Sequence, residues 1–382
     1  MTSAISFEIC TADGLARYGS LITPHAQVTT PAFMPVGTRA AVKAMAPDEL
    51  HSMGYRLVLA NAYHLALRPG ATLVQEMGGL AQFMGFEGAV LTDSGGFQAM
   101  SLARINSIDA AGIKFRSHID GAAVTLTPET AVEIQQRLGA DIMMALDECT
   151  PYPVDRGRAQ SSLELTARWA ERSLAAHDNP AQALFGIVQG SMYPDLRRLS
   201  ARQITSLGFD GFAVGGLSVG EPKHLMREIA ALCETTLPIT KPRYLMGVGT
   251  PQDLLVAIGM GYDLFDCVLP TRNARNGSAF TSEGPISIKR AAHRRDQQPL
   301  DPRCDCRVCR RFSRAYLRHL HLSGEILAAR ALTEHNLFFY AQLMREAQSA
   351  IASRTYKAFS TYWLNLLGEP NNTGGLADKD AV

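Results

Sequence analysis

The chain has 382 residues, of which 46% are hydrophobic and 19% are charged, and its formal net charge is +1 at pH 7. This composition is that of an ordinary globular protein and excludes disorder over most of the chain. The first ten residues, MTSAISFEIC, lack the basic region and the apolar core of a secretory signal, and no apolar run is long enough to cross a bilayer. We therefore expect a cytoplasmic protein with no membrane partner.

Residues 5–33 alternate apolar and polar side chains, which predicts short antiparallel strands beside a larger fold. From residue 32 onward, short apolar runs alternate with segments of helical period. The eight apolar runs are 32–37, 56–61, 89–96, 141–148, 183–190, 211–217, 243–249 and 262–269. The helical segments are 47–53, 69–77, 128–138, 158–176, 194–207, 222–233 and 251–260, and most of them open with a proline that suits a first helical turn.

Eight strand-and-helix repeats predict the α/β class and a (β/α)8 TIM barrel. The cysteine cluster described below adds an inserted zinc-binding subdomain near the C-terminus. The apolar runs are nearly continuous, as strands buried on both faces should be. A doubly wound open sheet is the alternative fold, and the absence of a glycine-rich phosphate loop after the first strand argues against it. Residues 111–127 alternate around Asp120-Gly121, which predicts a hairpin after the third strand.

We expect four parts along the chain. Residues 1–277 form the barrel and its N-terminal antiparallel strands, and residues 278–334 form the zinc-binding subdomain. Residues 335–367 are a C-terminal helical part that completes both the barrel and the zinc site, and residues 368–382, rich in Asn, Gly and Asp, are a disordered tail.

A cluster of cysteines predicts a metal site. Cys304, Cys306 and Cys309 form a C-x-C-x2-C motif, and His335 follows after a further 25 residues. Three thiolates and an imidazole are the ligand set of a closed, structural zinc site. The alternative, reduced cysteines in a loop, gives three clustered thiols no packing role in so polar a segment. We therefore predict one structural Zn²⁺ per chain.

Positive charge is concentrated in the same part of the chain. Residues Arg272 to Arg318 hold 12 Lys and Arg against 4 Asp and Glu, a local charge of +8. A local excess of positive charge favours contact with nucleic-acid phosphates. The alternative is that these basic residues only form the solvent-exposed face of a helix. Pro270 is predicted to end the eighth strand, and residues 271–277 to follow as a polar loop that could hold a phosphate or a planar polar edge.

In a barrel of this kind the chemistry lies at the C-terminal ends of the strands. The last residues of the runs include Asn61, Asp93, Asp147, Gln189, Gly215, Gly216, Met246, Gly247 and Asp266. Asp266 lies within an apolar run, where burying a carboxylate costs free energy unless it is paired or has a functional role. The alternative is a structural aspartate that caps a turn at the end of the strand.

This ring of acceptors and donors suits a flat polar ligand such as a purine. Asp147 would accept from its N–H groups, Gln189 and a glycine N–H would donate to a carbonyl oxygen, and Phe97 and Met246 would cover its faces. Two of the aspartates could then cleave a glycosidic bond, one as nucleophile and one as proton shuttle. Binding of a metal by the three aspartates is the competing use.

The chain contains the motifs LTDSGGFQ, FRSHIDG, LDECTPYP, GIVQGS, GFAVGGLSVGEP, FDCVLPTRNARNG and LDPRCDCRVC. Through these motifs, the chain resembles the bacterial tRNA-guanine transglycosylase family from about residue 7 to about residue 367. The resemblance implies a pentosyltransferase with a (β/α)8 barrel and a zinc subdomain, usually a homodimer. It further implies that guanine at the wobble position of the tRNA anticodon loop, in GUN-anticodon tRNAs, is exchanged for the 7-deazaguanine base 7-aminomethyl-7-deazaguanine. The exchange would pass through a covalent ribosyl-aspartate and serve queuosine biosynthesis.

The resemblance also implies roles for single residues. Asp266 resembles the nucleophile and Asp93 the general acid and base. The groups that resemble base-binding residues are Asp147, Gln189, Gly216 and Leu217, with Phe97 and Met246 as the stacking pair. Arg272 and Arg275 resemble contacts to the anticodon loop. Two rival functions remain: a non-catalytic RNA-binding subunit, which would have lost acids at the rim, and a purine glycosylase, in which water ends the reaction.

Overall fold

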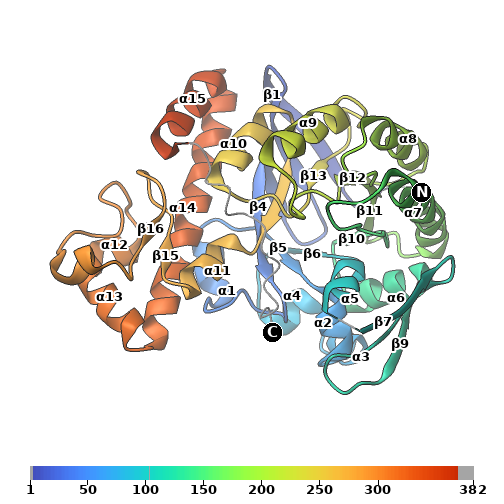
Figure 1. Ribbon diagram of the computed structural model, residues 1–382, viewed down its shortest axis with the longest axis horizontal. Helices are drawn as coiled ribbons and strands as arrows, with labels where there is room; N and C mark the ends of the chain where they lie inside the picture. Colours follow the sequence, from blue (N-terminus) through green and yellow to red (C-terminus); the bar gives the residue numbers. More distant parts are fainter. Residues whose placement is uncertain (1–2, 103, 369–382) are drawn as a thin grey trace.

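A computed structural model describes residues 3–102 and 104–368 (Figure 1). Apart from Gly368, the tail predicted at 368–382 lies outside these residues. Within the described ranges, no helix combines the length and the apolar character needed to span a bilayer.

Eight parallel strands close into a barrel, so the predicted (β/α)8 architecture is confirmed. The strands are β4 (Ala32–Gly37), β5 (Leu57–Ala60), β6 (Ala89–Thr92), β10 (Ile142–Met144), β11 (Ala183–Val188), β12 (Gly211–Val214), β13 (Arg243–Leu245) and β14 (Leu264–Cys267). They follow one another around the barrel in chain order, and β14 closes it by pairing with β4, with Asp266 opposite Met34. Each of the eight predicted apolar runs contributes one strand.

The barrel strands are buried on both faces, which explains their continuous apolar sequences. Alternate residues, such as Leu57 and Leu59 in β5, point inward and form one core inside the barrel. The residues between them, such as Val58, pack against the surrounding helices. The inner core also contains Leu21 and Val28, which come from the N-terminal sheet.

The predicted N-terminal strands form a three-stranded antiparallel sheet, β1 (Ser6–Asp13), β2 (Ala16–Ile22) and β3 (Gln27–Thr30). The loop after β2 reaches the start of β10, where the His25 N–H donates to Asp141 Oδ1 over 3.2 Å. In β2, Arg17 donates through Nε to Asp263 Oδ1 over 3.0 Å, and both side chains are buried. The sheet therefore covers the N-terminal end of the barrel, opposite the end where the chemistry is expected.

Helices surround the barrel (Figure 1). They are α1 (Pro47–Ser52), α2 (Ala62–Leu67), α3 (Ala71–Glu76), α4 (Leu80–Met84), α5 (Gly96–Leu102), α6 (Pro128–Leu138), α7 (Arg156–Ala176), α8 (Pro194–Thr205), α9 (Lys223–Glu234) and α10 (Pro251–Gly259). The helix predicted at 69–77 is present as α3, and the short helices α2 and α4 on either side of it were not predicted. Gly70, at φ 105°, and Gly79, at φ 85°, adopt backbone conformations that interrupt a helix.

The predicted hairpin after the third barrel strand is present as β8 (Gly112–Arg116) paired with β9 (Ala123–Leu126). A third strand that was not predicted, β7 (Arg104–Asp109), pairs with β8 to make an antiparallel sheet.

The C-terminal part continues from β14 into α11 (Leu269–Arg275). It then contains β15 (Ser278–Ala279), β16 (Ile286–Ser287), η1 (Ala291–Arg295), α12 (Arg307–Arg311), α13 (Arg314–Leu322), α14 (Ile326–Ala352) and α15 (Tyr356–Leu367). In Figure 1 the long helix α14 lies between the barrel and the lobe that contains α12 and α13. It is joined to the barrel by hydrogen bonds from Tyr340 Oη to Gly249 O (2.5 Å) and from Tyr55 Oη to Leu337 O (2.7 Å). The boundary expected between residues 334 and 335 falls inside this helix.

Candidate active site and metal centre

Asp266, the third residue of β14, is held by two hydrogen bonds. The Tyr244 hydroxyl donates to its Oδ1 over 2.6 Å, and the Gly247 N–H donates to the same oxygen over 2.8 Å. Burial raises the pKa of the Asp266 carboxyl, and these two hydrogen bonds oppose that shift. The carboxylate is thus oriented by β13 and the loop after it, while its other oxygen stays free of these bonds.

Sequence reasoning missed Tyr244, although a signal was available. Tyr244 lies two residues before Met246 and belongs to the core inside the barrel. Because a buried tyrosine hydroxyl needs a hydrogen-bond partner, its position two residues before the rim pointed to an acceptor at the end of a neighbouring strand.

Asp93 follows β6 directly and is 8% exposed. Its Oδ1 accepts from the Ala62 N–H over 2.8 Å, and its Oδ2 accepts from Asn61 Nδ2. Burial raises the pKa of Asp93 to about 6, and the charge of Asp266 contributes to the rise. The two carboxylates are therefore near enough to influence one another, as two acids at one barrel mouth should be.

Asp147 and Gln189 form a second polar pair, at the ends of β10 and β11. Gln189 Nε2 donates to Asp147 Oδ2 over 2.6 Å, and both side chains are buried. Burial raises the pKa of Asp147 to about 6. Two glycines adjoin the amide: a Cβ on Gly215 would lie 2.7 Å from Gln189 Nε2, and one on Gly216 would lie 2.4 Å from Oε1. The loop after β12 therefore approaches this pair by its backbone.

The three apolar candidates differ in exposure. Leu217 is 4% exposed and its side chain belongs to the core, so only its backbone is available to a ligand. Phe97, on α5, is 51% exposed, whereas Met246 is partly buried and packs against the core inside the barrel. The exposed phenyl ring is thus the freer of the two predicted stacking groups.

The predicted metal ligands converge. Cys304, Cys306, Cys309 and His335 place one ligand atom each within 4.8 Å of one another. In residues 3–102 and 104–368 this is the one group of three or more His, Cys, Asp or Glu side chains that could hold a metal ion. The three rim aspartates do not form such a group, so the competing use of these acids as metal ligands is not supported.

The imidazole is oriented for this role. His335 Nδ1 lies 3.7 Å from Cys304 Sγ, 3.5 Å from Cys306 Sγ and 3.3 Å from Cys309 Sγ. Its other nitrogen, Nε2, lies 2.7 Å from Phe280 O, which accepts only if Nε2 carries the proton. The lone pair of Nδ1 is then available to a metal ion. In known metal sites, a ligating histidine likewise donates its other N–H to a nearby acceptor. The four donors fit a closed tetrahedral site.

The expected polar loop at 271–277 is wrong, because Leu269–Arg275 form the helix α11. Pro270 lies in its first turn, where the missing N–H carries no penalty. Arg272 and Arg275 therefore project from a helix that begins two residues after β14. Neither forms an ion pair with any residue that the structure describes.

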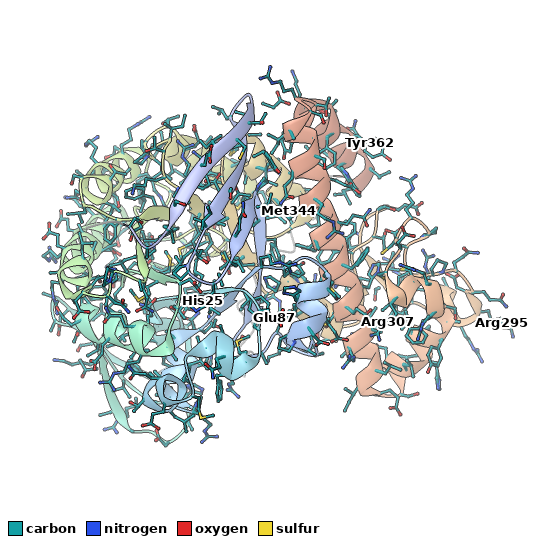
Figure 2. The ribbon with its side chains drawn as sticks, turned by 180° about the vertical axis from the view of Figure 1, so that it is seen from behind. His25, Glu87, Arg295, Arg307, Met344 and Tyr362 are labelled. Carbon is teal, nitrogen blue, oxygen red and sulfur yellow. The ribbon has the colours of Figure 1, made fainter. Side chains whose placement is uncertain are left out.

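Some arginines of the +8 segment have structural partners instead. Arg307 pairs with Glu334, and Arg314 pairs with Asp296 over 3.2 Å. Arg295 lies at the outer end of the lobe, whereas Arg307 lies closer to α14 (Figure 2). Asp296 is already counted in the net charge of +8, but Glu334 lies outside the segment and offsets one further positive charge.

Comparison with known proteins gives a consistent family. A family model described as queuine tRNA-ribosyltransferase matches residues 11–368. A queuine tRNA-ribosyltransferase of Methylobacillus flagellatus is 52% identical over 94% of this chain and 96% of its own length. Those of Caldanaerobacter subterraneus (53% identical, 91% and 94%) and Sorangium cellulosum (54% identical, 95% and 92%) are similarly related. The closed barrel and the acids at its mouth agree with this match, which extends along nearly the whole chain. The protein therefore belongs to the queuine tRNA-ribosyltransferase family of pentosyl-transferring enzymes.

Proposed function

We propose that the protein exchanges guanine at the wobble position of GUN-anticodon tRNAs for 7-aminomethyl-7-deazaguanine, as a step of queuosine biosynthesis. The observation that carries the proposal is the pair of carboxylates at one barrel mouth, Asp93 and Asp266, in different hydrogen-bonding environments. Two acids of this kind suit a double displacement at an anomeric carbon. The names of the related proteins, which specify tRNA and queuine, support the substrate classes.

Asp266 is proposed as the nucleophile. An attacking carboxylate must be ionised, and the Tyr244 and Gly247 donors stabilise its charged form. Both donors bind Oδ1, which leaves Oδ2 to attack the ribose C1′ and form a ribosyl ester. The second base then displaces the carboxylate, so that two inversions retain the configuration.

Asp93 is proposed as the general acid and base. A pKa of about 6 lets this carboxyl carry or release a proton close to neutral pH. It would protonate the departing guanine and later accept the proton of the incoming base. Ionisation of Asp266 helps, since its negative charge favours the protonated form of Asp93.

The base is proposed to bind between Asp147, Gln189 and the loop after β12. Asp147 accepts from the ring and exocyclic N–H groups, and Gln189 with the Gly216 N–H donates to the carbonyl oxygen. Leu217 contributes its backbone, and Phe97 and Met246 cover the ring faces.

The division of labour gives a test with labelled guanine and tRNA. Wild-type protein should incorporate the label into RNA. Asp266→Asn should form no covalent RNA adduct on a denaturing gel, because a carboxamide cannot attack. Asp93→Asn should still bind tRNA but react about 10²- to 10⁴-fold more slowly, the usual contribution of general acid–base catalysis.

A covalent adduct formed by Asp266→Asn would contradict the assignment and point to Asp93 as the nucleophile. The same assay separates the rival functions, because an abasic RNA product indicates a glycosylase and an unchanged RNA indicates a non-catalytic subunit. Asp109→Asn, at an exposed position in the inserted sheet, is the matched control and should leave exchange unchanged.

The cofactor is proposed to be one structural Zn²⁺ held by Cys304, Cys306, Cys309 and His335. Cys306→Ser should lose the metal and lower the melting temperature, since metal binding at a closed site contributes to folding. Metal content is measured on the purified chain by mass spectrometry. Cys10→Ser, at an exposed cysteine outside the cluster, is the control and should keep its zinc. Full zinc in Cys306→Ser, or a different metal in the wild type, would contradict the proposal.

Arg272 and Arg275 are proposed to contact phosphates of the anticodon loop. Binding of tRNA should weaken steeply with salt, and Arg272→Gln or Arg275→Gln should each reduce the slope of log K against log salt by about 0.7, the value for one phosphate of a single strand. Arg202→Gln, in the last turn of α8, is the control because that turn lies at the opposite end of the barrel. Equal slopes in all variants would exclude α11 from the interface.

Two expectations remain part of the proposal, a homodimer and a cytoplasmic location. Apolar side chains exposed on the lobe support self-association, since Ile326 is 83% and Leu322 is 56% exposed.

A further inference from the structure

A buried arginine lies beneath the base pocket. Arg197, in the first turns of α8, is 0% exposed. In the described ranges no carboxylate lies within ion-pair distance of it. Its acceptors are backbone carbonyls: Nε donates to Ser191 O (2.8 Å), Nη1 to Val188 O (3.0 Å) and Gly215 O (2.8 Å), and Nη2 to Gly216 O (3.3 Å).

Such an arrangement is costly unless the charge has a use. A buried cation loses its hydration, and four carbonyl dipoles replace that hydration only because the guanidinium presents its donors in a rigid fork. An apolar side chain of similar length would avoid the cost of the buried charge but would remove the donors from the carbonyls of Ser191, Gly215 and Gly216. The fork joins two loops that are distant in sequence, the one after β11 and the one after β12.

The geometry of the peptide group shows what the fork does. In a trans peptide the C=O of one residue and the N–H of the next point in opposite directions. Because Arg197 binds the carbonyls of Gly215 and Gly216, the N–H groups of Gly216 and Leu217 point away from it. Gly216 has φ +65°, a conformation that few other residues adopt.

The same glycines lie against the polar pair of the pocket. A Cβ at Gly215 would lie 2.7 Å from Gln189 Nε2 and 3.5 Å from Asp147 Oδ2. Gln189 is itself fixed at its backbone, where its N–H donates to Ser200 Oγ over 3.0 Å, one turn along α8 from Arg197. The helix α8 thus contacts both the backbone of Gln189, through Ser200, and the neighbouring glycine carbonyls, through Arg197.

We propose that Arg197 is a positioning residue for recognition of the base carbonyl: it orients the Gly216 and Leu217 N–H groups toward the base while α8 holds Gln189 beside them. The inference rests on the proposed function, because it assumes that a guanine-type base occupies this pocket. Arg197 would thereby maintain the preference for a base that carries a carbonyl group, although it does not contact the base itself.

The test compares two bases by calorimetric binding to the full chain. Guanine carries the carbonyl oxygen, and 6-thioguanine keeps the ring N–H and the amino group but carries sulfur, a weak acceptor. Wild type should prefer guanine by about 10-fold or more, the effect of a well-placed hydrogen bond at a buried site. In Arg197→Met the preference should fall to about 3-fold or less, because the donors are no longer held. Arg197→Lys, which keeps the charge but not the fork, should lie between them.

Arg202→Met, on the exposed side of the same helix, is the matched control and should keep the wild-type preference. A purely structural role for Arg197 predicts lower melting temperatures with an unchanged ratio, and that result would overturn the inference. Failure of both Arg197 variants to fold would overturn it as well, because the residue would then serve the fold and not the pocket. Absence of guanine binding by the wild type would instead refute the proposed function.

Discussion

The candidate active site depends on the pairing of β14 with β4, which closes the barrel. This pairing places Asp266 opposite Met34, a residue more than two hundred positions earlier in the chain. Strand β5, which ends beside Asn61, and strand β6, which ends beside Asp93, follow β4 in order around the barrel. Closure therefore brings together carboxylates from the third and the eighth barrel strands, and an open sheet of the same strands would keep them apart.

Burial at the mouth of the barrel gives these groups their chemical character. The pKa values of Asp93 and Asp147 rise to about 6 chiefly because the surroundings disfavour charge. The N-terminal sheet covers the opposite end of the barrel. The buried Arg17–Asp263 pair joins this sheet to the residue that precedes β14. Loss of one partner of such a pair leaves an uncompensated buried charge, so the pair holds the sheet against the barrel only while both residues are present.

Much of the fold could be predicted from the sequence, because continuous apolar runs and first-turn prolines are local signals. The metal ligands were equally accessible, since Cys304, Cys306 and Cys309 lie within six residues of one another. The polar loop expected after β14 was wrong because Pro270 suits a strand end as well as the first turn of α11. The helices α2 and α4 were missed because Gly70 and Gly79 separate them from α3 and leave them only six and five residues long.

Other features depend on contacts between distant residues. The place of Tyr244 in an apolar run indicated that its hydroxyl needs an acceptor, but that the acceptor is Asp266 became evident only once β13 and β14 were paired. Arg197 had no signal at all in the sequence, because an arginine in a helix of period 3.6 is usually exposed. Its burial became evident only once the loops after β11 and β12 were in place beside it.

The position of α14 has a consequence for the order in which the protein is made. Tyr340 of this helix packs against Phe33 of β4, the first barrel strand, with ring centroids 4.8 Å apart. During synthesis β4 leaves the ribosome early and α14 nearly last, so an incomplete chain exposes the outer face of β4 to water. Exposed apolar strand surface of this kind invites aggregation, and a nascent chain that ends before residue 326 is a natural client for a chaperone. The helix that covers this strand surface is also the one that carries His335, the predicted metal ligand.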